Sequence, residues 1–274
     1  MWFVRVTPLA LVPLLVGPAY GVDVTMCGEV VPAGEVGVLQ ADLTCGPAIM
    51  VEEGATLDLN GHMLNMSSGA VGVLCGGDCV VTSSVGTGTI VGPDPGGESC
   101  GQLCCGILGY RTTRASNLTI SAFSSGILSR RLEAAHVSAS NNLRGLEARS
   151  ALLDNVTAND NSEVGVITED SPSLIRMTDS TVSGNGGAGI TIGGTRGGRL
   201  NAVGVTITNN GCVGVVARER KHVRLADSQV TGHAIDLETA KRPQVSDTAC
   251  GTSSHLTGGG CTVNGPWGVC ANDP

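Results

Sequence analysis

The sequence predicts an all-β fold, a right-handed parallel β-helix (solenoid) of about eight coils with disulfide-bearing end caps. A Gly-(Ile/Val/Leu) motif recurs from Gly72 to Gly214, mostly at intervals of 19 to 25 residues. A repeat of this length indicates a solenoid. Between the motifs lie alternating runs of three to five residues, such as 117–121 and 203–207, which are too short for helices. The leucine-rich repeat shares this period, but its Leu-x-x-Leu-x-Leu spacing does not recur here.

A row of asparagines fits the same geometry. Asn141, Asn161, Asn185 and Asn210 each lie four residues before the next glycine of the repeat. Asparagine side chains stacked on successive coils can hydrogen-bond along the axis. We therefore expect a structural Asn ladder.

The chain divides into four parts. Residues 1–21 have one charge, Arg5, an apolar stretch and small residues near a cleavage point, as in a signal peptide. A short N-terminal anchor is the alternative. Residues 22–70 are expected to form an N-terminal cap and first coil, 71–242 the repeats with a Cys-containing loop at 93–105, and 243–274 a Cys-rich C-terminal cap. The mature protein is then secreted, periplasmic or on the cell surface, with no stable membrane span.

The chain has 11 cysteines, and exported chains of this kind usually form disulfides. A zinc site at Cys75 and Cys79 is the alternative, although no further ligand set follows. Cys212 is the most isolated and is expected to be the unpaired thiol. The disulfide candidates are Cys27, Cys45, Cys75, Cys79, Cys100, Cys104, Cys105, Cys250, Cys261 and Cys270.

Composition narrows the choice of partners. The net charge of −8 argues against a general nucleic-acid binder. Only 2% of the residues are aromatic, so the chain cannot build the long aromatic platform that neutral-sugar binders usually offer. A charged glycan is the better expectation.

A stripe of arginines is the strongest candidate for a binding site. Its members lie four or five residues after successive repeat glycines: Arg111, Arg130, Arg131, Arg149 and Arg218. On successive coils they would repeat about every 4.8 Å and favour a polyanion. Glu169 and Asp170 occupy the same place on another coil and could hold Ca²⁺ or share proton transfer with Arg131 and Arg149. The plainer interpretation is a solvated turn in which these charges pair with one another.

The other polar residues carry weaker signals. Asp154, Asp179 and Asp227 each open an Asp-(Asn/Ser) pair, which is an ordinary turn former. The run Arg218–His222 is typical of a solvated face, and its histidine is expected to be incidental.

Several segments resemble the right-handed parallel β-helix proteins of the pectate-lyase-like superfamily. They are Leu57–His62 with the repeated Gly-Ile/Val coils, Cys27-Gly-Glu through Cys45, and the tail with Cys250-Gly-Thr-Ser and Trp267-Gly-Val-Cys270. The family's fold hosts lyases, hydrolases, epimerases and non-catalytic proteins. The Asn-Thr-Asp, Gly-His-Gly and Asp-Pro-His-Glu motifs of its polygalacturonase-like and epimerase-like members are absent.

The sequence thus favours an exported solenoid that binds or processes an acidic polysaccharide along one face. In that case Arg111, Arg130 and Arg218 would bind substrate, and Arg131, Arg149, Glu169 and Asp170 would be catalytic. No cofactor is required, and Ca²⁺ is the ion the two carboxylates could hold. The alternative is a non-catalytic structural or interaction solenoid of the cell envelope, whose partner is an envelope component.

Overall fold

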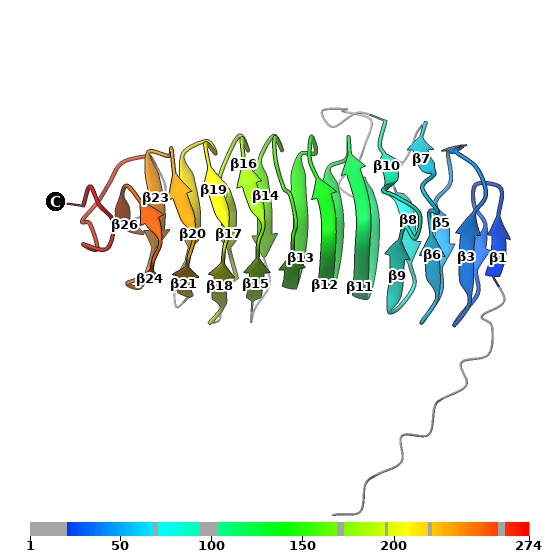
Figure 1. Cartoon of the computed structure of the whole chain (residues 1–274), viewed down its shortest axis with the longest axis horizontal. Coiled ribbons are helices and arrows are strands. Elements are labelled where there is room, and N and C mark those ends of the chain that lie inside the picture. The colour runs from blue at the N-terminus through cyan, green and yellow to red at the C-terminus, as the bar shows by residue number, and fades with distance from the viewer. Residues whose placement is uncertain are drawn as a thin grey trace, which may run out of the picture.

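The computed structural model shows an all-β parallel solenoid of about 9 turns, without helices in its described part (Figure 1). It describes residues 21–67, 71–93, 104–168, 173–194, 197–218, 221–256 and 261–273. Successive turns follow one another along the long axis, from the N-terminal strands at one end to the C-terminal segment at the other. All strand pairs in these ranges are parallel, as the repeat predicted.

Strand register sorts the solenoid into three lateral faces. Face A contains β2 (Val30–Val31), β5 (Ile49–Val51), β8 (Val71–Cys75), β14 (Val164–Thr168), β17 (Ile190–Ile192), β20 (Val213–Ala217), β23 (Ile235–Thr239) and β26 (Ser253–His255). Face B contains β1 (Gly21–Val24), β3 (Val36–Leu39), β6 (Thr56–Asp58), β9 (Cys79–Thr82), β15 (Leu174–Thr178), β18 (Arg199–Val203), β21 (His222–Ala226) and β24 (Gln244–Ser246). Face C contains β4 (Leu43–Cys45), β7 (Met63–Met66), β10 (Gly88–Val91), β16 (Thr181–Ser183), β19 (Thr206–Thr208), β22 (Gln229–Thr231) and β25 (Ala249–Cys250).

Three long strands run around the corners between these faces. β11 (Cys105–Ser121) pairs in turn with β8, β9 and β10, so it contributes to all three faces. β12 (Ser125–Ala139) and β13 (Arg144–Asp154) follow it on the next two turns. These strands form the middle of the solenoid.

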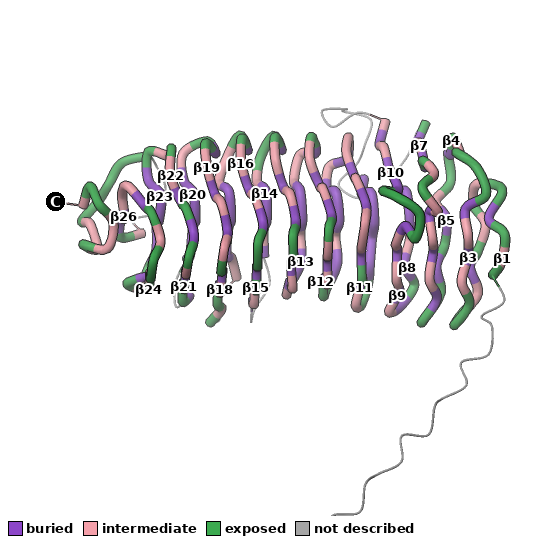
Figure 2. The backbone as a smooth tube through the Cα atoms, viewed as in Figure 1, coloured by how far each residue is buried: buried purple, intermediate pink, exposed green. Residues whose placement is uncertain are grey.

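The core is built from aliphatic side chains stacked turn upon turn. On face B one inward column runs through Leu57, Val81, Ala115, Ala134 and Leu153, each paired with the next. All of them are buried, and Figure 2 shows buried residues recurring along successive turns. Phe123 is a fully buried aromatic in this otherwise aliphatic stack. Burial of such columns is the main source of stability in the fold.

A buried Asn ladder runs along the axis, but its first member is not the predicted one. The backbone N–H of Asn142 donates to Oδ1 of Asn161 at 3.0 Å. Asn161 and Asn185 continue the ladder through amide contacts of 2.9 and 2.7 Å, and Asn210 follows. Asn141 is exposed and has a φ of 57°, so it forms the turn instead. The prediction of Asn141 was wrong because the ladder residue of this turn lies three, not four, positions before its glycine.

The ladder also explains the repeat glycines. A Cβ at Gly145 would lie 2.9 Å from Nδ2 of Asn161 and 2.5 Å from the carbonyl oxygen of the next repeat glycine, Gly165. Gly189 meets Asn210 and Gly214 in the same way, at 2.7 Å each. Since any side chain would collide with the ladder, glycine is required there.

A buried histidine and aspartate end the ladder. Nδ2 of Asn210 lies 3.1 Å from Nε2 of His233, whose Nδ1 lies 2.8 Å from Oδ1 of Asp236. The His233 side chain has no exposed surface. Oδ2 of Asp236 accepts the backbone N–H groups of Gly251 and Thr252 at 2.5 and 3.1 Å. The ladder is therefore tied to the first residues after β25.

Four disulfides lie in the described residues: Cys27–Cys45, Cys75–Cys79, Cys212–Cys261 and Cys250–Cys270. They fit an oxidising environment. Cys104 is also disulfide-bonded, and Cys100 lies outside the described residues. Cys212 was wrongly predicted to be the unpaired cysteine: the segment after β26 brings Cys261 to it.

The free thiol is Cys105, which was predicted as a disulfide candidate. It opens β11 and is completely buried. Burial raises the pKa of Cys105 to about 12, and the nearby Glu147 carboxylate adds to this effect. Its thiol is therefore expected to stay protonated at neutral pH.

The C-terminal residues 261–273 close the last turn. The Trp267 ring stacks on His255 at a centroid distance of 3.5 Å, and its Nε1 donates to the carbonyl of Ser254. Asp273 accepts hydrogen bonds from Ser253 and Cys270. Burial by itself would raise the pKa of Asp273, but these hydrogen bonds and that from Val269 lower it. The carboxylate thus stays ionised and holds the segment in place.

Candidate functional site

The predicted arginine stripe is only partly formed. Arg130 and Arg149 share one register position, because the residues on either side of them pair across β12 and β13. They lie at the corner between faces A and B. Arg111 lies in a register irregularity of β11, 3.4 Å from Glu53, and Arg218 is exposed after β20. The predicted arginines therefore do not form one continuous row. They lie near the corner as separate cations with different neighbours.

Arg131 lies beyond this corner, on face B. It pairs in register with Thr112 and Ser150. Glu133 receives both Arg131, at 3.0 Å, and Arg114, at 2.9 Å. These two arginines therefore share one carboxylate of the protein, which offsets one of their two positive charges.

The predicted acidic partners, Glu169 and Asp170, lie outside the described residues. Within the described ranges, no group of three His, Cys, Asp or Glu side chains is placed to hold a metal ion. In the same ranges, no helix is long and apolar enough to cross a lipid bilayer.

The three predicted turn aspartates occupy corner positions between faces B and C. Asp179 and Asp227 have φ values of 45° and 48°, which aspartate tolerates better than most residues. Asp154 accepts the hydroxyl of Thr178 at 2.5 Å. These contacts agree with a role in the turns.

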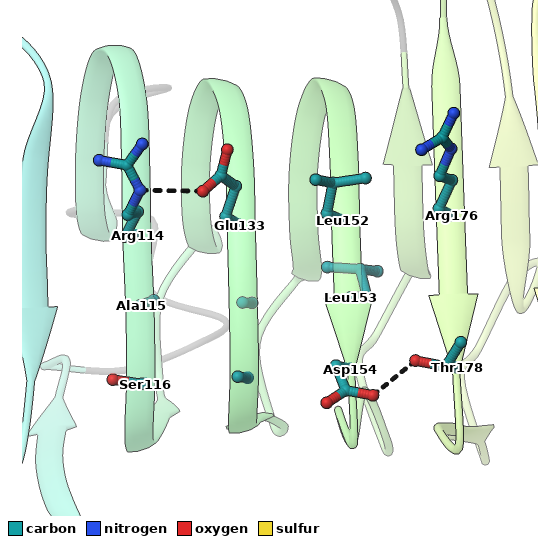
Figure 3. A pocket seen from close by; sticks show the side chains of 11 residues that line it. Arg114, Ala115, Ser116, Glu133, Leu152, Leu153, Asp154, Arg176 and Thr178 are labelled. Carbon is teal, nitrogen blue, oxygen red and sulfur yellow. Dashed lines mark hydrogen bonds and ion pairs between the residues drawn. The ribbon is translucent and has the colours of Figure 1, made fainter. Parts of the chain in front are cut away.

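A shallow hollow of about 390 Å³ lies in the middle of face B (Figure 3). Arg114, Glu133, Leu152 and Arg176 cross it in one outward row, on four successive turns. Figure 3 shows the Arg114–Glu133 ion pair at one side, with Arg176 beyond Leu152. Charges of both signs line this hollow, so it has no clear preference for an anion.

Beyond Arg176, face B becomes cationic. We call Arg176, Arg199, His222, Arg224 and Lys241 the cationic face. All but Lys241 are exposed, and that lysine is partly buried. Arg176, Arg199 and Arg224 make no ion pair with any described residue, and two hollows of about 500 Å³ each lie beside them without a carboxylate in their lining. On a chain with a net charge of −8, this surface is the place best suited to an anion.

The protonation of His222 responds to this environment. Its Nε2 lies 3.1 Å from Nζ of Lys241. Partial burial lowers the pKa of His222, and the positive charges of Lys241, Arg199 and Arg224 lower it further. Desolvation and, after it, these positive charges therefore favour the neutral form of His222 at pH 7.

Sequence reasoning did not identify this surface. It treated His222 as incidental and did not single out Arg176, Arg199, Arg224 or Lys241. The available signal was alternation: in Leu174–Met177 and Val223–Leu225 an arginine lies between two apolar residues, which places it outward on a half-buried strand.

Comparisons with models of protein families, with characterised proteins and with solved structures find no match for this chain. The structure defines the class of protein as a parallel β-solenoid.

Proposed function

We propose that this protein is an exported β-helix protein of the pectate-lyase-like type, right-handed as that resemblance implies, that binds an acidic polysaccharide along face B. The observation that carries the proposal is the group of arginines without ion-pair partners among the described residues: Arg176, Arg199 and Arg224. Exposed guanidinium groups bind carboxylates bidentately and repeat on successive turns of the solenoid.

The predicted stripe contributes less to this proposal than the cationic face does. Arg111 and Arg131 contact carboxylates of the protein itself. Arg130, Arg149 and Arg218 could extend the surface around the corner. Four disulfides support an extracellular or otherwise oxidising location.

Binding is tested by isothermal titration calorimetry with polygalacturonate, polymannuronate and neutral dextran. The double variant Arg176→Ala/Arg224→Ala should lose about 25-fold in affinity for a polyuronate, since an exposed charge pair contributes up to about 1 kcal/mol. Arg114→Ala is the matched control, because this arginine lies in the same outward row but is paired with Glu133.

Absence of binding to either polyuronate by a folded, oxidised sample would refute the proposal. So would an equal loss in Arg114→Ala. The same mixtures can be analysed for products by mass spectrometry, with and without Ca²⁺. Products that disappear in Arg131→Ala or Arg149→Ala would extend the proposal from binding to cleavage.

A further inference from the structure

The charges of the cationic face alternate between two outward rows. The central row runs through Arg176, Asn201, Arg224 and Gln244, which pair in register. The edge row, two residues earlier on each strand, runs through Leu174, Arg199 and His222. The central row is therefore charged on β15 and β21, and the edge row on β18.

Lys241 continues this alternation on the next turn. It lies just before β24, and its contact with Nε2 of His222 places its ammonium group beside the edge row. Because the lowered pKa favours the neutral form of His222 at pH 7, the fixed charge of the β21 turn on these rows is that of Arg224. Four consecutive turns thus present their cations in the order centre, edge, centre, edge. The last turn has two of them, because Arg242 lies next to Lys241 and two residues before Gln244, at the edge-row position.

The run has defined ends. On the preceding turn, the matching positions of β13 are Ser150 in the edge row and Leu152 in the central row, and neither has a charge. One turn further, Arg131 contacts the carboxylate of Glu133, which it shares with Arg114. After β24 the chain pairs β26 with β23 on face A and continues into the C-terminal segment.

Strand geometry gives the scale of the pattern. Consecutive cations are offset by about 4.8 Å along the solenoid axis and about 6.6 Å across it, the distance between alternate residues of one strand. An extended β-1,4-linked uronate advances along its own axis by a length per sugar similar to the axial offset between consecutive cations. Its successive sugars are turned over, so that their carboxylates project alternately to the two sides.

We infer that the cationic face binds four consecutive acidic sugars of an extended, ribbon-like polyanion that lies along the solenoid axis. This inference rests on the proposed function and names the substrate class within it. Carboxylates of alternate sugars would meet Arg176 and Arg224 on one side, and Arg199 and the Lys241–Arg242 pair on the other. The amides of Asn201 and Gln244 lie between the central charges, where they can hydrogen-bond to sugar hydroxyls. A polymer whose charges all project to one side would face these neutral amides at every second turn.

The test compares β-1,4-linked oligomannuronates with α-1,4-linked oligogalacturonates by calorimetry, from disaccharide to octasaccharide. Affinity for the β-linked series should rise about fivefold with each added sugar up to the tetrasaccharide and then level off. The α-linked tetrasaccharide, whose backbone is not a flat ribbon, should bind at least tenfold more weakly. Arg199→Ala and Arg224→Ala should each lower the tetrasaccharide affinity about fivefold, while Arg114→Ala should leave it unchanged.

Three outcomes distinguish the alternating site from the proposed function. Affinity that keeps rising with length beyond the tetrasaccharide, or equal binding of both series, would refute the alternating site and leave polyanion binding intact. Failure of all oligomers and of both parent polymers to bind would refute the proposed function itself.

Discussion

Nζ of Lys241 and Nε2 of His222 lie 3.1 Å apart, so a titratable ring sits directly against a fixed positive charge on the cationic face. The pKa of His222 is lowered by partial burial and then by Lys241, Arg199 and Arg224. A bound polyanion would offset those charges and raise that pKa again. If the protein binds a polyanion as proposed, binding would be coupled to proton uptake.

Affinity for a polyuronate should consequently increase as the pH falls. We expect about fivefold tighter binding at about pH 5 than at about pH 8, the contribution of one further exposed charge pair. His222→Gln should remove this difference, whereas His62→Gln, which changes a histidine on another turn, should keep it. Calorimetry at both pH values checks the prediction, and an unchanged pH profile in His222→Gln would contradict it.

Asn142 and Asn141 provide a test of the ladder with adjacent residues. Asn142→Ala removes the acceptor for the backbone N–H of Phe123 and the donor to the carbonyl of Ile120, so it should reduce the free energy of unfolding by about 3 kcal/mol. Asn141→Gly should be nearly neutral, because glycine adopts the positive φ of this turn. Urea denaturation followed by circular dichroism compares the two. A larger loss for Asn141→Gly would mean that the register of this turn is misassigned.

Asp236 should be the most sensitive carboxylate in the described part of the chain. Its two oxygens accept from His233, Gly251 and Thr252, and Asp236→Asn would place a donor against at least one of these N–H groups. We expect a loss of about 3 kcal/mol in stability. Asp227→Asn is the control, since asparagine tolerates the exposed turn that Asp227 occupies. Equal unfolding midpoints for the two variants would rule out a structural role for the His233–Asp236 pair.

The thiol of Cys105 should be unreactive in the folded protein. Because it is buried and its pKa is raised to about 12, a maleimide should label it only after denaturation. Peptide mapping of protein unfolded without reductant should then find the label on Cys105. Label on Cys212 instead would contradict the Cys212–Cys261 disulfide.

The solenoid was predictable because its signals are local and repeated. A glycine is needed wherever the side-chain amide of a ladder asparagine lies against the backbone of the turn. Each strand also alternates inward and outward residues. These constraints appear in the sequence at every turn, as at Gly145 and Gly189. The pairing of Cys27 with Cys45 likewise joins neighbouring turns of one end.

The cationic face was not predictable in the same way, because it depends on alignment between turns. Glu147 and Ser150 align with Ile167 and Leu174, so the corner between faces A and B lengthens from one turn to the next. Counting residues from the repeat glycine identifies equivalent positions at that corner, such as Arg130 and Arg149. Beyond the corner the count no longer matches equivalent positions, because the length of the corner differs between turns. Arg176, Arg199 and Arg224 become neighbours only when their strands are paired. A one-residue difference in the spacing before Gly145 likewise led to the prediction of Asn141 in place of Asn142.

The disulfides near the two ends affect how the molecule can come apart. A solenoid without such links would be expected to fray, losing its terminal turns one at a time because each turn contacts only its neighbours. Here Cys27–Cys45 fastens the first turns, and Cys212–Cys261 with Cys250–Cys270 fastens the last ones. Unfolding from either end is thereby restrained, and unfolding would be expected to start in the interior turns between these links. Resistance to exoproteases and to slow unfolding from the ends would follow from this arrangement, and reducing agents should abolish it.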